Sequence, residues 1–220
     1  MLTGIIPNEE KEEPMKKLRE TRGFTLIEVI VVIAVVAILA AILTPTVVKN
    51  IDDSKIARAK NEVQVIGAAM TSFYKDLGRW PTSNGSTGNP DSLYMLNGPG
   101  NTPSYDNSVN NHANWWTYYK DTNTYGDLME NHLIKNDPKG GSVDYPTTGE
   151  YRWHGPYLSE IKADPWGSYY ASNVRYFYSG QPDAVFVWSP GPDRQADTQF
   201  DQDVTNSPTL GDDDIGMRLK

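Results

Sequence analysis

The chain of 220 residues contains no cysteine and only three histidines. The absence of cysteine excludes a disulfide framework and a thiolate metal site. The histidines, at positions 112, 132 and 154, show no metal-ligand spacing. Basic residues are outnumbered, since 20 Lys and Arg against 28 Asp and Glu leave a net charge of -8. Binding to nucleic acid requires clustered cations that neutralise phosphates, so we expect no nucleic-acid partner.

One long apolar segment stands out against this polar composition. Residues 29–43 contain only Val, Ile, Ala and Leu, and the wider segment 24–48 has 25 residues. At about 1.5 Å per residue, a helix of this length exceeds the hydrocarbon core of a bilayer, which is roughly 30 Å thick. The segment is longer than the apolar region of a secretory signal peptide and has no evident break. We therefore expect a membrane-spanning helix that is retained in the mature protein.

Basic residues precede this segment and predict its orientation. Residues 15–23 contain four basic residues and one acidic residue: Lys16, Lys17, Arg19, Arg22 and Glu20. Basic residues just before an apolar run hold that end in the cytoplasm. Residues 1–23 are therefore expected to form a targeting leader, with either Met1 or Met15 as the initiating residue.

Two residues in the apolar segment are unusual for lipid. Glu28 places a carboxylate at the head of the segment, where an ionised group is costly unless it touches water or finds a partner. Pro45 removes a backbone hydrogen bond and predicts a kink or a locally melted turn, although proline is tolerated in membrane helices.

The chain after this segment continues as an amphipathic helix. Apolar residues recur at alternating steps of three and four: Ile56, Ala59, Val63, Ile66, Met70, Phe73 and Leu77. This spacing predicts one apolar helix face, and Gly78 is placed to cap the end. We expect one helix over 24–77. Its first half, 24–48, suits lipid, and its continuation, 49–78, suits packing on a sheet.

The remaining sequence divides into a loop-rich insert and a sheet. Residues 79–150 are rich in Asn, Gly, Ser, Thr and Pro, with a short helix expected near 124–135. An aromatic cluster in this insert is interpreted as core rather than as a binding surface: Trp115, Trp116, Tyr118 and Tyr119. Four short runs then predict an antiparallel sheet of three or four strands within 151–220. These runs are 155–161, 167–173, 174–180 and 184–191. The fold class expected is α+β, with the long helix covering one face of the sheet.

The stretch RGFTLIEVIVVIAVVAILAAILTP resembles the signal of type IV pilins and type II secretion pseudopilins. A Gly follows a basic leader, a Phe follows the Gly, a Glu lies four residues later, and a Pro ends the run. The resemblance implies cleavage after Gly23 by a membrane prepilin peptidase and N-methylation of Phe24. The new amine would pair with Glu28 of a neighbouring subunit in a homopolymer filament. It also implies a helix segment around Pro45 that melts as the subunit leaves the bilayer.

The C-terminal half is similar to the major, G-type pseudopilin. The stretch 155–170 contains its Asp-Pro-Trp-Gly turn, and SPGPD and GDDDIG resemble the two ends of its calcium loop. The resemblance implies that the calcium ligands in this chain are the carboxylates of Asp193, Asp213 and Asp214 and a carbonyl near Pro190.

The composition of this region fits a calcium site. Calcium prefers six to eight oxygen ligands. Residues 183–214 hold eight Asp and one basic residue, Arg194, so without a cation we expect the loop to loosen. The loop and the insert are both longer than in the family pattern.

Three functions follow from these observations. The first is a structural subunit of a type II secretion pseudopilus, with minor pseudopilins and an inner-membrane assembly platform as partners. It would be single-pass in the inner membrane of a Gram-negative bacterium before assembly, with a periplasmic C-terminal domain. The second is a type IV pilin of a surface filament for adhesion, motility or DNA uptake. The third is a membrane-tethered hydrolase or sugar-binding domain using acids such as Glu150 and Glu160, but no nucleophile–base set accompanies them. We expect no enzyme.

Overall fold

The computed structural model describes residues 23–86, 92–105, 125–141, 143–178, 180–199 and 201–220. The chain divides into two units, Met1–Val48 and Lys49–Lys220. Nearly all of the predicted leader and the whole aromatic cluster at 114–119 lie outside the described residues.

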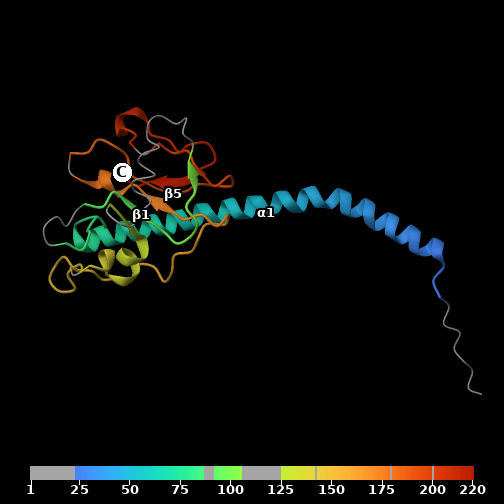
Figure 1. Cartoon of the computed structure of the whole chain (residues 1–220), viewed down its shortest axis with the longest axis horizontal. Coiled ribbons are helices and arrows are strands. Elements are labelled where there is room, and N and C mark those ends of the chain that lie inside the picture. Colours follow the sequence, from blue (N-terminus) through green and yellow to red (C-terminus); the bar gives the residue numbers. More distant parts are fainter. Residues whose placement is uncertain (1–22, 87–91, 106–124, 142, 179, 200) are drawn as a thin grey trace, which may run out of the picture. The chain divides into compact units, whose positions relative to one another are not determined.

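A single helix, α1, spans Leu26–Leu77 over 52 residues, as the sequence predicted (Figure 1). Pro45 lies inside it and does not end it. Proline has no N–H, so it cannot donate the usual helix hydrogen bond to the carbonyl four residues earlier. The hydroxyl of Thr44, the residue directly before the proline, donates to the carbonyl of Ala40 at 2.6 Å.

The second half of α1 buries the predicted face. Of the seven apolar positions, six are buried and Ile56 is half-buried. Phe73 and Met70 are completely enclosed. Gly78 has φ +66°, and its N–H donates to the carbonyl of Tyr74 at 2.8 Å. This left-handed residue ends the helix as a glycine cap does, so that prediction is confirmed.

The sheet has five strands in the order β3-β1-β4-β5-β7. Their bounds are β1 Met95–Asn97, β3 Gly126–Leu128, β4 Ala171–Ser172, β5 Phe186–Ser189 and β7 Ile215–Arg218. The β1–β3 pair is parallel and the other three pairs are antiparallel. A separate parallel pair joins β2 Ser104–Tyr105 to β6 Gln195–Ala196. The α+β class is confirmed, but the sheet is mixed and not wholly antiparallel.

Several predicted strands were wrong. The run 155–161 forms no strand, and the run 174–180 begins with a 3-10 helix, η3 Val174–Phe177. Conversely, β1 and β3 lie in the segment that was predicted to be loop. The prediction missed them because strands of three residues are too short to show an alternating pattern. The predicted short helix is present as a helical turn at 129–130 followed by η1 Asn131–Lys135. Two more 3-10 turns are η2 Pro138–Gly140 and η4 Val204–Asn206.

Two apolar clusters lie on opposite faces of the sheet. Val187 of β5 belongs to the cluster that contains α1 residues such as Phe73. Its neighbours Phe186 and Trp188 belong to the other cluster. Successive side chains of a strand point to opposite faces, so α1 covers one face, as expected, and Figure 1 shows its second half running along the sheet. The far face is covered by the C-terminal region that carries the acidic residues.

Candidate functional site

The start of α1 is held by a reciprocal hydrogen-bond pair. The Glu28 N–H donates to Thr25 Oγ1 at 3.3 Å, and the Thr25 N–H donates to Glu28 Oε2 at 2.8 Å. The Thr25 hydroxyl also donates to Glu28 Oε2 at 2.8 Å. This is a capping box, which satisfies N–H groups that a helix start leaves without partners. Glu28 therefore has a function within its own chain, which the sequence analysis did not identify.

The apolar half of α1 is exposed along its whole length. Phe24 is 88% exposed, and the Val, Ile and Leu residues that follow it are exposed by about half or more. Among the described residues, α1 is the one helix that is long and apolar enough to cross a membrane. An apolar surface of this extent requires lipid or other helices to cover it.

Three carboxylates converge in the C-terminal region. One oxygen from each of Asp193, Asp197 and Asp213 lies within 4.8 Å of the others. The sequence analysis selected Asp193 and Asp213. Asp197 was included there only in the count of eight Asp residues within 183–214. We call these three residues the acidic cluster, and residues 190–214 the acidic loop.

The acidic loop has two arms, one that carries Asp193 and Asp197 and one that carries Asp213. The arms approach closely because glycine occupies both contact points. A Cβ on Gly191 would lie 2.3 Å from the carbonyl oxygen of Asp213, and a Cβ on Gly211 would lie 2.3 Å from the carbonyl carbon of Asp197. Any side chain there would force the arms apart. The approach allows the Asp193 N–H to donate to Asp213 Oδ2 at 3.2 Å.

Asp214 lies beside the cluster in a different environment. Its Oδ2 accepts from the N–H of Asp197 at 3.1 Å, and from the N–H and hydroxyl of Thr198 at 2.6 and 2.5 Å. Burial raises the pKa of Asp214 to about 7, although these hydrogen bonds act to lower it. Burial, together with the charge of Asp193, also raises the pKa of Asp213.

The donor set fits a hard cation such as calcium. All candidate ligands are oxygens, and three of them are carboxylates, which calcium prefers. Asp213 Oδ1 and Asp214 Oδ1 are both buried, and neither accepts a hydrogen bond within the described part of the chain. A buried acceptor without a partner is costly. Pro190 is buried directly after β5, and the role of its carbonyl stays a prediction.

Two other acids of the loop accept local hydrogen bonds. Asp203 Oδ1 accepts from the N–H of Thr205 at 2.8 Å and caps η4. Asp201 Oδ1 accepts from Gln199 Nε2 at 3.1 Å. Neither belongs to the acidic cluster.

Two family descriptions match the chain, each over one of these regions. The prokaryotic N-terminal methylation motif matches residues 18–44. The type II secretion system protein G domain matches residues 140–207. Together, the two matches support a pseudopilin of the G type. The first match includes Gly23, Phe24 and Glu28, and the second includes Asp193 and Asp197 but ends before Asp213.

A curated relative agrees with this assignment. The type II secretion system core protein G of Pseudomonas aeruginosa is 35% identical over 65 residues, which are 30% of this chain and 46% of that protein. The chain thus spans less than half the length of the curated relative it matches. No solved structure matches the chain.

The Asp-Pro-Trp-Gly motif forms the predicted turn. Asp164 Oδ1 accepts from the N–H groups of Trp166 and Ser168 at 3.0 and 2.8 Å, and Gly167 has φ +92°. The carbonyl of Ala163 accepts from Arg58 of α1 at 3.5 Å. The turn is therefore attached to the helix.

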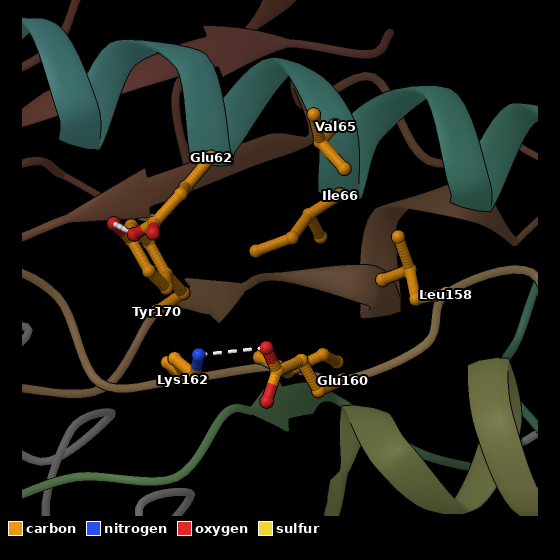
Figure 2. Close-up of a pocket in the computed structure, with 8 residues that line it drawn as sticks. Glu62, Val65, Ile66, Leu158, Glu160, Lys162 and Tyr170 are labelled. Carbon is orange, nitrogen blue, oxygen red and sulfur yellow. Dashed lines mark hydrogen bonds and ion pairs between the residues drawn. The ribbon is translucent and has the colours of Figure 1, made fainter.

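A groove of about 190 Å³ lies between α1 and the segment around this turn (Figure 2). Its apolar lining includes Val65 and Leu158. At one end, the Tyr170 hydroxyl donates to Glu62 Oε2 at 2.5 Å. Burial, and then the Glu62 carboxylate, raise the pKa of Tyr170 well above its ordinary value. The hydroxyl therefore keeps its proton and remains a donor.

The buried His132 belongs to a structural network. It lies between Asp127 and Tyr145, with Nε2 2.9 Å from Asp127 Oδ2 and Nδ1 2.7 Å from the Tyr145 hydroxyl. His132 is completely buried, and Asp127 is 2% exposed. No substrate could reach either group, so the pair stabilises the fold around η1. The acids of the third hypothesis, Glu150 and Glu160, are not paired with each other: Glu150 is exposed, and Glu160 pairs with Lys162 at 2.7 Å.

Proposed function

We propose that the chain is a pseudopilin, a structural subunit of a type II secretion pseudopilus, which polymerises through the first half of α1 and drives the export of folded proteins. The observation that carries the proposal is the combination in one chain of two features. These are the methylation motif on an exposed apolar helix and the protein G domain. The role is structural and requires no catalytic group.

The first step is processing of the leader. Prepilin peptidase would cut on the cytoplasmic side between Gly23 and Phe24, and Phe24 would be N-methylated. Cleavage leaves a cationic amine four residues from the Glu28 carboxylate. In a low-dielectric environment an opposite charge offsets much of the cost of an ionised group. The amine of one subunit would therefore pair with Glu28 of its neighbour.

Assembly then moves the apolar helix from lipid to protein. The subunit would start as a single-pass protein of the inner membrane with its C-terminal domain in the periplasm. The inner-membrane assembly platform would add it to the filament, and minor pseudopilins would share that filament. Pro45 leaves one helix carbonyl without its usual donor. The turn around Pro45 is therefore the weakest place in this half of α1, where melting would accompany the transfer.

Calcium would be held by the acidic cluster. We assign the carboxylates of Asp193, Asp197 and Asp213, with Asp214 and the carbonyl of Pro190 as further ligands. A bound calcium ion would neutralise the charge of the acidic cluster and so stabilise the contact between the two arms of the loop.

Deletion of the gene and two assays test the proposal. Secreted exoproteins are measured in the medium, and surface filaments are counted by electron microscopy. The proposal predicts that secretion is lost while surface filaments persist, and that the wild-type gene restores secretion. Loss of surface filaments with normal secretion would instead support the pilin of a surface filament, which would carry the same methylation motif.

A matched pair of variants separates assembly from folding. Glu28→Gln keeps the size and the hydrogen-bonding oxygen of the side chain but removes its charge, and Thr25→Ser keeps the hydroxyl of the capping box. We expect filament yield to fall strongly with Glu28→Gln and to persist with Thr25→Ser. Equal yields would contradict the charge pairing.

A further inference from the structure

One buried hydrogen bond joins the acidic loop to the Asp-Pro-Trp-Gly turn. Ser189, the last residue of β5, is completely buried, and its hydroxyl donates to Asp164 Oδ2 at 2.6 Å. The same hydroxyl accepts from the N–H of Gly191 at 3.2 Å. Gly191 lies directly against the backbone of Asp213. A single side chain thus contacts both the turn and the first arm of the loop.

Ser189 also marks the place where the second arm returns to the sheet. It pairs with Ile215 across the β5–β7 ladder, and Ile215 directly follows Asp214. Both arms of the acidic loop therefore leave the sheet at Ser189 and its partner. A change in the position of Ser189 would move Asp193 and Asp213 relative to each other.

Asp164 is the fixed partner in this bond. It is 4% exposed and accepts three hydrogen bonds, two from its own turn and one from Ser189. Hydrogen bonds to a carboxylate are stronger than those between neutral groups. The turn itself is attached to α1 through Arg58 and Ala163. The acidic loop is therefore connected to the filament-forming helix by consecutive hydrogen bonds.

We infer that Ser189 and Asp164 are positioning residues for the calcium site. Their hydrogen bond holds the base of the loop so that the acidic cluster converges, and it transmits calcium binding to the turn that lies on α1. This inference rests on the calcium site of the proposed function. The plain alternative is a hydrogen bond that stabilises the fold without affecting the loop.

Calcium titration of the purified full chain in detergent distinguishes these two roles. Removing a residue that orients a metal ligand weakens metal affinity by about 10- to 100-fold, and we expect Ser189→Ala to do so. Ser172→Ala is the matched control. Ser172 is also a completely buried serine of the sheet, and its hydroxyl has no partner within the described residues. It should leave the calcium dissociation constant unchanged.

Hydrogen exchange gives a second readout, which a merely stabilising bond would not change. The N–H groups of Trp166 and Ser168 both donate to Asp164. Calcium should slow their exchange in the wild type but not in Ser189→Ala. If Ser189→Ala does not fold, Asp164→Asn replaces it, because asparagine keeps the oxygen for the turn and loses the acceptor for Ser189.

The outcomes separate the two proposals. Calcium binding by the wild type with equal affinity in Ser189→Ala or Asp164→Asn overturns this inference and leaves the calcium site intact. A wild type that binds no calcium overturns the calcium site, and the inference with it. Weaker binding in both variants, with Ser172→Ala unchanged, supports the inference.

Discussion

Removal of calcium from the acidic loop should destabilise the folded chain by a predictable amount. The three carboxylates of the acidic cluster lie within 4.8 Å of one another. At that separation each charged pair repels by about 3.5 kcal/mol at an effective dielectric constant of about 20, and by about 0.9 kcal/mol in bulk water. The cluster is partly exposed, so the true repulsion lies between these limits. A bound cation would offset it.

The expected gain in stability follows from mass action. Calcium at about 100 times its dissociation constant stabilises a folded chain by about 2.7 kcal/mol. For a chain of this size, about 1 kcal/mol corresponds to roughly 2–4 °C in Tm. We therefore expect the Tm of the full chain in detergent to rise by roughly 5–11 °C between excess chelator and saturating calcium.

Two variants identify the residues responsible. Asp197→Asn removes a charge from the acidic cluster and should abolish most of the shift. Asp201→Asn removes a charge from the same loop outside the cluster and should retain it. The same Tm in chelator and in calcium would refute the site. Equal losses in the two variants would refute this ligand set and leave only a general effect of loop charge.

Two further predictions concern the fold. Phe73 of α1 is completely buried against Tyr145 and Tyr157. Phe73→Ala should therefore lower the free energy of unfolding, measured by chemical denaturation, by about 3–5 kcal/mol. A loss below about 1 kcal/mol would contradict the packing. Burial raises the pKa of Asp127, but hydrogen bonds from His132 and from backbone N–H groups outweigh it and hold the pKa below its ordinary value. A lowered pKa contributes stability that is present above the unfolded value of about 3.9 and is lost as the pH falls through the folded value. The Tm of the wild type should therefore fall more steeply below pH 4 than that of Asp127→Asn, and parallel curves would refute this.

The sequence predicted the elements whose signals are local. The buried face of α1 follows from steps of three and four, and Gly78 ends the helix as its position indicated. The turn at Asp164 follows from four consecutive residues. Each of these depends on neighbours within one or two helical turns, which a sequence displays directly.

Contacts between distant segments were not visible in the sequence. The strands β1 and β3 have three residues each and pair in parallel, so no alternation or hairpin turn reveals them. Asp197 joins Asp213 only because Gly191 and Gly211 let the two arms approach. Its presence in an acidic stretch was noted, but no spacing rule selects it. The sequence shows a glycine at position 211, but the close approach of Gly211 to the backbone of Asp197 is visible only in the structure.

The family resemblance and the structure give the Glu28 carboxylate two different partners. The resemblance assigned its carboxylate to a neighbouring subunit, and the structure places it in a capping box with Thr25. The proposed pairing with an amine would use the same carboxylate as the capping box. A subunit that enters the filament would therefore exchange a contact within its own chain for a stronger one with a charged amine.

The central claim is that the leader is removed and the apolar helix is kept. Mass spectrometry of the N-terminal peptide of protein purified from its native host tests this directly. We expect an N-terminal peptide that begins at Phe24 and carries one methyl group on its amine. A mature chain that still begins at Met1 or Met15, or that has lost the segment 24–48, would contradict it.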